Sequence, residues 1–194
     1  KENLTLPSQL ERLLLSHRKC PNIASDDLLD SIYGAFFGFL IGDIVGAHIA
    51  YKLYNVYEIP AALLMNGGGT YNIGPGQGTD QTEIMLTACY GLIEGGNVYN
   101  ADCMARRYLG WLESKPFNIS AIYILSLIEI KRKKQQLKGI SPDGLGELLR
   151  QNSQKNKNHE SNLGLIRVLP LVVWSLNLTE REFHKLLRGS AFLT

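Results

Sequence analysis

Apolar side chains recur every three or four residues along most of the chain, and this spacing predicts helices that each bury one face. Capping residues precede several of the apolar runs, and glycine pairs or prolines follow them. The predicted helices are Ser25–Asp43, Asp80–Glu94, Ala101–Glu113, Asn118–Leu137, Ser141–Gln151, Leu163–Leu176 and a last one opened by a Thr179–Glu182 capping box. No stretch alternates as a strand does, and no repeat is visible. We therefore predict an all-α fold.

The remaining stretches read as loops or as a terminal arm. Residues 1–24 form a predicted polar arm with one short helix, Gln9–His17, and 25–194 form the helical domain. We expect Tyr51–Asn66 to be irregular or a short helix broken by Pro60, and the polar stretch Asn152–Ser161 to be a surface loop. No signal peptide is expected at the start, because the arm lacks an apolar run of sufficient length.

One segment, Ile32–Tyr51, is apolar enough to be mistaken for a membrane span. An acidic residue near its middle, Asp43, would cost about 3 kcal/mol on insertion. The preceding residues are acidic and offer no lysine or arginine as an anchor. We therefore expect a buried helix of a water-soluble domain and no membrane partner.

Composition adds only broad limits. The chain has 194 residues, of which 45% are apolar and 20% are charged, as in ordinary globular domains. A net charge of +2 demands no nucleic acid, and the basic run IKRKKQQLK is interpreted as a solvated helix end. Three widely spaced cysteines form no zinc motif and favour a reducing compartment, so we expect a cytoplasmic or otherwise intracellular protein.

Glycines occupy every fourth position from Gly34 to Gly46, which places them along one ridge of a helix. One interpretation is tight packing against another helix. The other is that Gly42 and Asp43 end the helix beside a site. Asp43 is the only charged residue in this apolar segment, and a buried carboxylate is costly without a partner. We expect Asp43 to cap or bind something.

The stretch Gly67–Leu86, GGGTYNIGPGQGTDQTEIML, is a glycine-rich loop that runs straight into a helix. Such a junction gathers backbone N–H groups and side-chain oxygens at one point, which suits an anion or a metal ion. Thr79, Asp80, Gln81 and Thr82 stand there, and their hard oxygens favour Mg²⁺ over Zn²⁺. A second interpretation, that these residues only cap the helix, stays open.

Other chemistry finds little support. The chain contains no G-x-S-x-G, H-E-x-x-H, Walker or Rossmann motif, and its four histidines are scattered. Arg167 is the only charge in the predicted helix Leu163–Leu176, so we expect it to pair with a carboxylate or to face a site.

Four stretches together resemble the ADP-ribosylglycohydrolase family from about Leu28 to Thr194. They are GAFFGFLIGDIVG, the loop GGGTYNIGPGQGTDQTEIML, WLESKPFNI and ESNLGLIRVLPL, in the family's order. The resemblance implies an all-α domain that hydrolyses the N- or O-glycosidic bond between ADP-ribose and a protein side chain or small acceptor. It also implies a pair of magnesium ions.

The resemblance assigns roles to the loop and the helix start. The family's T-D-D-T motif supplies metal ligands from its first three residues, and Thr79, Asp80 and Gln81 stand there, with an amide in the third place. Asp80 is also implied in catalysis. The resemblance further implies that the loop wraps the phosphates of ADP-ribose through backbone amides. These substrate-binding positions are Gly74, Gly76, Gln77 and Gly78.

Three further positions depart from the family pattern. Asn118, in PFNIS, stands where the family's P-F-D-I-G has aspartate, and is implied in ribose binding and catalysis. Asn162 is implied in substrate binding, although Leu163 replaces the glycine that follows it in the family's S-N-G motif. Ala50 stands where the family often has a glutamate shortly after the G-D-x-x-G turn.

The neutral residues Ala50, Gln81 and Asn118 lead to two hypotheses, because divalent cations are held by ligand charge and acid–base catalysis needs a titratable group. The first is an enzyme with a weakened or single-metal site. The second is a non-catalytic relative that binds ADP-ribose or is structural. The family's aspartate-rich second metal motif lies beyond the sequence given, so we expect the chain to cover about two thirds of a full domain.

Overall fold

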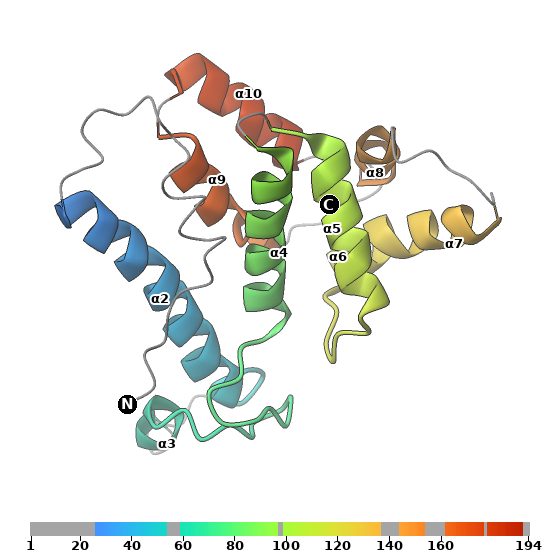
Figure 1. The fold of residues 1–194 in the computed structure, drawn as a ribbon. Coiled ribbons are helices and arrows are strands. Elements are labelled where there is room, and N and C mark those ends of the chain that lie inside the picture. The colour runs from blue at the N-terminus through green and yellow to red at the C-terminus, as the bar shows by residue number, and fades with distance from the viewer. Residues whose placement is uncertain are drawn as a thin grey trace. The chain divides into compact units, whose positions relative to one another are not determined.

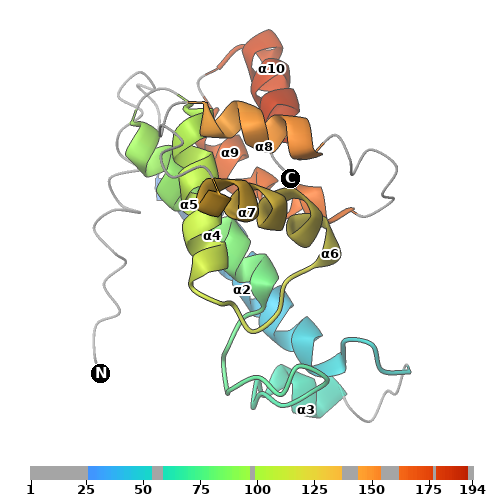
Figure 2. The ribbon, with the colours of Figure 1, turned by 90° about the vertical axis from the view of Figure 1, so that its right-hand side faces the viewer.

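The computed structural model describes residues 26–53, 59–96, 99–136, 144–153, 162–176 and 178–191. Within these ranges every regular element is helical, apart from one isolated bridge between Gly68 and Ile73. The all-α prediction is confirmed. The chain divides into two compact units, 23–83 and a second that contains 84–194, and each is described by itself (Figures 1 and 2). The predicted arm 1–24 and its helix Gln9–His17 lie outside the described residues.

The first unit is built on one long helix. It contains α2 (Asp26–Ile49), the short α3 (Ile59–Leu63), the glycine-rich loop and the first turn of α4 (Asp80–Gly95). Both views place α3 beside the C-terminal end of α2 (Figures 1 and 2). Pro60 does not interrupt this segment as predicted. It stands in the first turn of α3, where the missing N–H of proline costs no helical hydrogen bond.

α2 is longer than predicted, because it continues past Asp43 and ends at Ile49. Ile44 and Ala47 are buried three residues apart, so the apolar face of the helix continues through this part. The helix ends where Tyr51 adopts a left-handed backbone conformation, with φ of 61°. The expectation that the helix closes at Gly42 and Asp43 is therefore wrong.

The glycine ridge of α2 has no close neighbour among the described residues. A Cβ added to Gly34, Gly38, Gly42 or Gly46 would meet no atom within 4 Å in the described part of the chain. No described neighbour comes close enough to require glycine, and the packing interpretation stays a prediction. Each interior glycine still costs about 1 kcal/mol relative to alanine.

By length and composition, α2 could also cross a membrane, but the core helix of a water-soluble protein meets the same criteria. Phe37 and Ile41 are both exposed on it. The expectation that Ile32–Tyr51 is not a membrane span stays a prediction.

The glycine-rich loop folds tightly onto itself and onto the end of α2. A Cβ on Gly67, whose φ is +78°, would lie 2.3 Å from the carbonyl oxygen of Ile73. A Cβ on Gly69, whose φ is +70°, would lie 2.8 Å from the carbonyl oxygen of Ala47. Nδ1 of His48 lies 2.8 Å from the carbonyl oxygen of Gly67. Only glycine fits at these two positions, and the contacts fix the loop against α2.

The second unit is organised around α5 (Ala101–Glu113), whose bounds are as predicted. The side chain of Asn100 caps the helix by accepting from the N–H groups of Asp102 at 2.9 Å and Cys103 at 3.1 Å. The apolar face of α5 joins that of α4 in one buried cluster. Its members include Ile84, Ala88, Leu92, Met104, Tyr108, Trp111, Leu112, Tyr123, Leu127, Leu149 and Leu171.

The single helix predicted for Asn118–Leu137 is a continuous run of three segments. They are α6 (Ala121–Tyr123), the π-helical η2 (Ile124–Ile128) and α7 (Glu129–Gln136). The π-helical widening was not predicted. The hydroxyl of Ser126 donates to the carbonyl of Ile122 at 3.0 Å within this widened part.

α8 (Leu145–Ser153) packs against α5. Its last residues, Asn152 and Ser153, are buried, so the expected surface loop does not begin at Asn152. The carboxylate of Asp102 accepts from the N–H of Gly146 at 2.7 Å and ties the start of α8 to α5. The rest of the predicted loop, residues 154–161, lies outside the described residues.

The helix predicted for Leu163–Leu176 is interrupted. The structure has a 3₁₀ turn, η4 (Asn162–Leu165), followed by α9 (Val168–Trp174). Pro170 explains the break, because it has no N–H to donate to the carbonyl of Ile166 and its ring would clash with that carbonyl in a continuous helix. Proline is instead accommodated in the first turn of α9.

Arg167, at the break, is buried with an exposed fraction of 1%. Its Nη2 donates to the carbonyl oxygen of Ser190 in α10 (Glu180–Ala191) at 3.1 Å. This contact joins α9 to α10 within the second unit, so the described hydrogen bond of Arg167 supports the fold and involves a backbone carbonyl.

α10 opens with the predicted capping box, which is confirmed. One carboxylate oxygen of Glu182 accepts from the backbone N–H of Thr179 at 2.9 Å and from its hydroxyl at 2.7 Å. The N–H of Glu182 in turn points to the Thr179 hydroxyl oxygen at 3.4 Å. The hydrogen bonds from Thr179 lower the pKa of the Glu182 carboxyl.

We expect Thr179→Ala to lower the free energy of unfolding by about 1 kcal/mol at pH 7, whereas Thr179→Ser should match the wild type. Because the folded pKa of Glu182 is depressed, its contribution is present above its unfolded pKa and is lost as the pH falls through the folded pKa. The difference between Thr179→Ala and the wild type should therefore shrink in acid. Urea unfolding at pH 7 and pH 3 measures this, and identical curves for both proteins at pH 7 would exclude the cap as a stabilising feature.

Candidate active site

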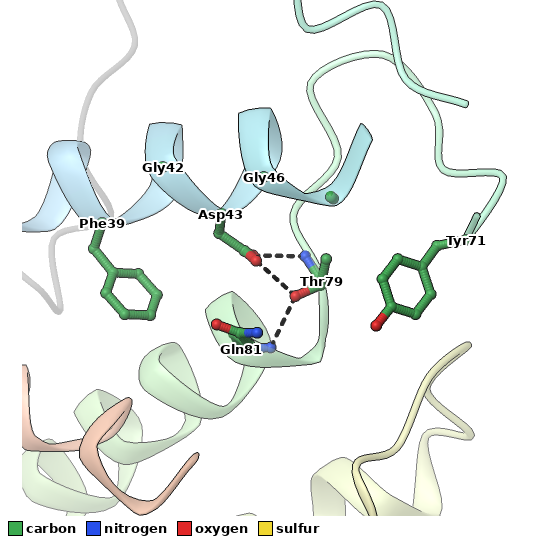
Figure 3. A pocket seen from close by; sticks show the side chains of 8 residues that line it. Phe39, Gly42, Asp43, Gly46, Tyr71, Thr79 and Gln81 are labelled. Carbon is green, nitrogen blue, oxygen red and sulfur yellow. Dashed lines mark hydrogen bonds between the residues drawn. The ribbon is translucent and has the colours of Figure 1, made fainter. Parts of the chain in front are cut away.

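A pocket of about 320 Å³ opens in the first unit beside the start of α4 (Figure 3). One wall is a single face of α2, with lining residues spaced by three and four positions. The opposite side comes from the glycine-rich loop and the first turn of α4. The lining residues are Phe39, Gly42, Asp43, Gly46 and Ala47 on α2, together with Tyr71, Thr79 and Gln81. The volume lies at the lower end of the range for small-molecule sites.

Asp43 connects the two walls through three hydrogen bonds. Its Oδ2 accepts from the backbone N–H of Thr79 at 2.7 Å and from the hydroxyl of Thr82 at 2.6 Å. Its Oδ1 accepts from the hydroxyl of Thr79 at 2.7 Å (Figure 3). Thr79 and Thr82 are both buried. The expectation that Asp43 caps something is confirmed: the carboxylate caps the first turn of α4 from another helix.

This arrangement changes what the helix start offers to a ligand. The positive N-terminal end of a helix attracts an anion, and the carboxylate of Asp43 already occupies that place at α4. Among the described residues, none of the eight that line the pocket is basic. The pocket is therefore suited to a cation or an uncharged polar group, and a phosphate would meet a carboxylate without a compensating positive side chain.

Tyr71 adds an aromatic wall with a polar tip. Its ring meets that of Tyr51 edge-on, with centroids 5.9 Å apart, and its hydroxyl points toward the pocket (Figure 3). Burial raises the pKa of the Tyr71 phenol, as do its hydrogen bond with Tyr51 and the nearby carboxylates of Asp80 and Asp43. The phenol therefore stays protonated at ordinary pH and keeps its hydrogen bond with Tyr51.

The first turn of α4 carries the oxygen donors that a magnesium ion would need. The Thr79 hydroxyl donates to Asp43 and accepts from the N–H of Gln81 at 3.2 Å, which leaves one lone pair for a cation. Gln81 lines the pocket, and the adjacent Asp80 is buried, with an exposed fraction of 2%. Hard oxygens of this kind are the ligands that Mg²⁺ prefers, and Asp80 is the charged residue among these three. Among the described residues no group of three or more His, Cys, Asp or Glu could hold a metal.

Comparison with known proteins places this chain in a family. A family model described as ADP-ribosylglycohydrolase matches residues 24–194. The chain belongs to the ADP-ribosylglycohydrolase family. It is also 33% identical over 94 residues to the ADP-ribosyl-[dinitrogen reductase] glycohydrolase of Rhodospirillum rubrum. That match covers 46% of this chain and 31% of the relative, so the chain spans about a third of the length of the curated relative.

In this member of the ADP-ribosylglycohydrolase family, the loop N–H groups predicted to bind phosphate already donate to other groups of the protein. The N–H of Gly74 donates to the side chain of Gln77 at 2.8 Å, and the N–H of Gln77 donates to the carbonyl of Gly74 at 3.1 Å. The N–H of Gly76 donates to the carbonyl of Met65 at 2.9 Å. A phosphate could use these three amides only by displacing their present partners. Gly78, the fourth predicted position, packs against Thr82, 2.9 Å from an added Cβ.

The structure gathers only some of the residues that the resemblance to the ADP-ribosylglycohydrolase family singled out. Thr79 and Gln81 line the pocket, and Asp80 stands between them. Asn118 and Asn162 belong to the second unit and are not among the lining residues, so their roles stay predictions.

The residue at the family's glutamate position, Ala50, has no carboxylate to offer this pocket. Ala50 lies just after the end of α2, where its carbonyl accepts from the hydroxyl of Thr70 at 2.7 Å. It does not line the pocket.

The sequence interpretation missed two aromatic lining residues, Phe39 and Tyr71. Phe39 lies four positions before Asp43, so helical spacing from the isolated carboxylate would have found it. Tyr71 carries no such signal, because it enters the pocket through the fold of an irregular loop.

Proposed function

We propose that this pocket receives the ribose end of an ADP-ribosylated molecule and promotes hydrolysis of its glycosidic bond, assisted by one Mg²⁺ ion. The observation that carries the proposal is the first turn of α4. There Thr79 and Gln81 line a small pocket on either side of the buried Asp80, and Asp43 orients Thr79. Membership of the ADP-ribosylglycohydrolase family supports the reaction class.

Each residue has a separate task in this proposal. Thr79, Asp80 and Gln81 hold the ion, which when bound supplies positive charge to polarise the reacting bond and to acidify a water molecule. Asp43 keeps the Thr79 hydroxyl in one orientation through a 2.7 Å hydrogen bond. Asp80 is the buried carboxylate of this turn, and in this proposal it accepts a proton there. Tyr71 provides an aromatic wall for the ligand.

The phosphates of the substrate lie outside this pocket in the proposal. The pocket lining offers them no basic side chain, and Asp43 occupies the helix start. We propose that they contact the rim of the Gly67–Gly78 loop after Gly74 and Gln77 release their mutual hydrogen bonds. The predicted contacts of Asn118 and Asn162 with ribose hydroxyls and substrate form part of the same proposal.

The neutral side chain of Gln81 favours a second candidate function, ADP-ribose binding without hydrolysis. Asp43 commits both its oxygens to Thr79 and Thr82, so a metal at this turn would be held by little charge beyond that of Asp80. A site that binds the ligand without the ion would keep the pocket and lose the reaction.

Calorimetric titration with ADP-ribose, with and without Mg²⁺, tests the binding part of the proposal. We expect micromolar binding that tightens when Mg²⁺ is present. In Asp80→Asn the Mg²⁺-dependent gain should disappear while metal-free binding remains. The absence of binding under both conditions would exclude the pocket as an ADP-ribose site, and binding that ignores Mg²⁺ would favour the non-catalytic function.

A further inference from the structure

Two glycines, which have no side chains, lie in the middle of the pocket wall on α2. Gly42 and Gly46 both line the pocket, and an added Cβ at either would meet no atom within 4 Å in the described part of the chain. Gly34 and Gly38 continue the same ridge and are equally uncrowded, but they do not line the pocket. The four positions thus share one helix and one packing environment, and only two of them face the ligand space.

Among the described residues of the first unit, none requires glycine at Gly42 or Gly46. Both lie inside α2, where alanine favours the helix more than glycine does. Neither has a positive φ, and no described neighbour would clash with a methyl group. What a side chain would change is the space beside Asp43, where a ligand approaches the backbone.

The chemistry around this bare surface fits an uncharged, hydroxyl-bearing ring. The wall offers the backbone of α2, the ring of Phe39 and the polar ends of Tyr71 and Gln81. Asp43 already holds the anion position at the start of α4. A sugar ring presents flat C–H surface to the backbone and hydroxyl groups to the polar side chains, whereas a phosphate finds no positive partner in the lining.

We propose that Gly42 and Gly46 are specificity-determining residues whose missing side chains let the ribose next to the scissile bond lie against the backbone of α2. This inference rests on the proposed function, because it assumes that the pocket receives the ribose end of ADP-ribose. It adds which surface the ribose touches and a role for two glycines that no described neighbour crowds.

The test compares Gly42→Ala and Gly46→Ala with the matched control Gly38→Ala. All three variants should melt about 2–4 °C above the wild type, because each removes one helix-interior glycine. Calorimetry then measures affinity for two probes, ADP-ribose and ADP, which lacks the terminal ribose. We expect the pocket variants to bind ADP-ribose at least tenfold more weakly than Gly38→Ala does, with ADP affinity unchanged within twofold in every variant.

The outcomes separate this inference from the proposed function. If the wild type binds ADP-ribose and the pocket variants bind it equally well, the role of Gly42 and Gly46 is overturned while the proposed function stands. Equal losses for ADP-ribose and ADP would also overturn it, because the pocket would then receive the nucleotide end. If the wild type binds no ADP-ribose, the role of Gly42 and Gly46 and the proposed function are both overturned. Weaker binding together with higher melting temperature is the combination that a purely structural role would not produce.

Discussion

Asp43→Ala is expected to lower the free energy of unfolding by about 3–5 kcal/mol, the largest effect on stability that we predict for a single side chain. The substitution leaves three donors, the N–H and hydroxyl of Thr79 and the hydroxyl of Thr82, without their ionised acceptor. Hydrogen bonds to charged groups contribute about 1.5–3 kcal/mol each and are not additive. Both threonines are buried, so water would replace the carboxylate poorly.

Urea unfolding followed by circular dichroism at pH 7 measures this effect. Asp30→Ala is the matched control, since it removes an exposed carboxylate from the same helix and should change the free energy of unfolding by less than about 0.5 kcal/mol. Asp43→Asn should fall between the two, because its amide nitrogen cannot accept from the donors at its position. A loss below about 1 kcal/mol for Asp43→Ala would contradict the assignment of Asp43 as the cap of α4.

Gln81→Asp is expected to raise the affinity for Mg²⁺ at least tenfold. The substitution adds a second carboxylate beside Asp80 at the pocket, and divalent cations are held mainly by such charges. Under the proposed function the same variant should also release ADP-ribose faster than the wild type. The Mg²⁺ affinity can be measured by calorimetry, with the rise in melting temperature at saturating Mg²⁺ as a second readout.

Asn72→Asp provides the control for that experiment. It adds the same charge to an exposed position of the same loop, outside the pocket lining, and Asn72 has a positive φ that aspartate tolerates better than most residues. We expect little change in Mg²⁺ affinity there. An equal increase in both variants would indicate non-specific attraction, and no increase in Gln81→Asp would exclude the first turn of α4 as the metal site.

The sequence predicted best those elements whose ends are decided by adjacent residues. The bounds of α5 follow from Asn100 before it, and the start of α10 follows from the Thr179–Glu182 capping box. The end of α2 and the break before α9 were missed. Gly42 does not end α2, which continues to Ile49. Pro170 interrupts the helix predicted for Leu163–Leu176, so that α9 begins at Val168.

The candidate site shows the same division between local and distant contacts. Thr79, Asp80 and Gln81 could be grouped from sequence because they are consecutive, and Asp43 could be singled out because it is the only charge in an apolar segment. Their pairing could not be derived, because it joins residues 36 positions apart. Tyr71 was missed for a similar reason, since the path of a loop brings it to the pocket.

Release of ADP-ribose from ADP-ribosylated arginine and serine substrates, followed as Mg²⁺ is titrated, tests the central claim most directly. The wild type should show slow release that requires Mg²⁺ and stops when EDTA is added. Asp80→Asn, checked for a wild-type melting temperature, should lose at least 100-fold of that rate. No release by the wild type, or release that survives both EDTA and Asp80→Asn, would contradict the account.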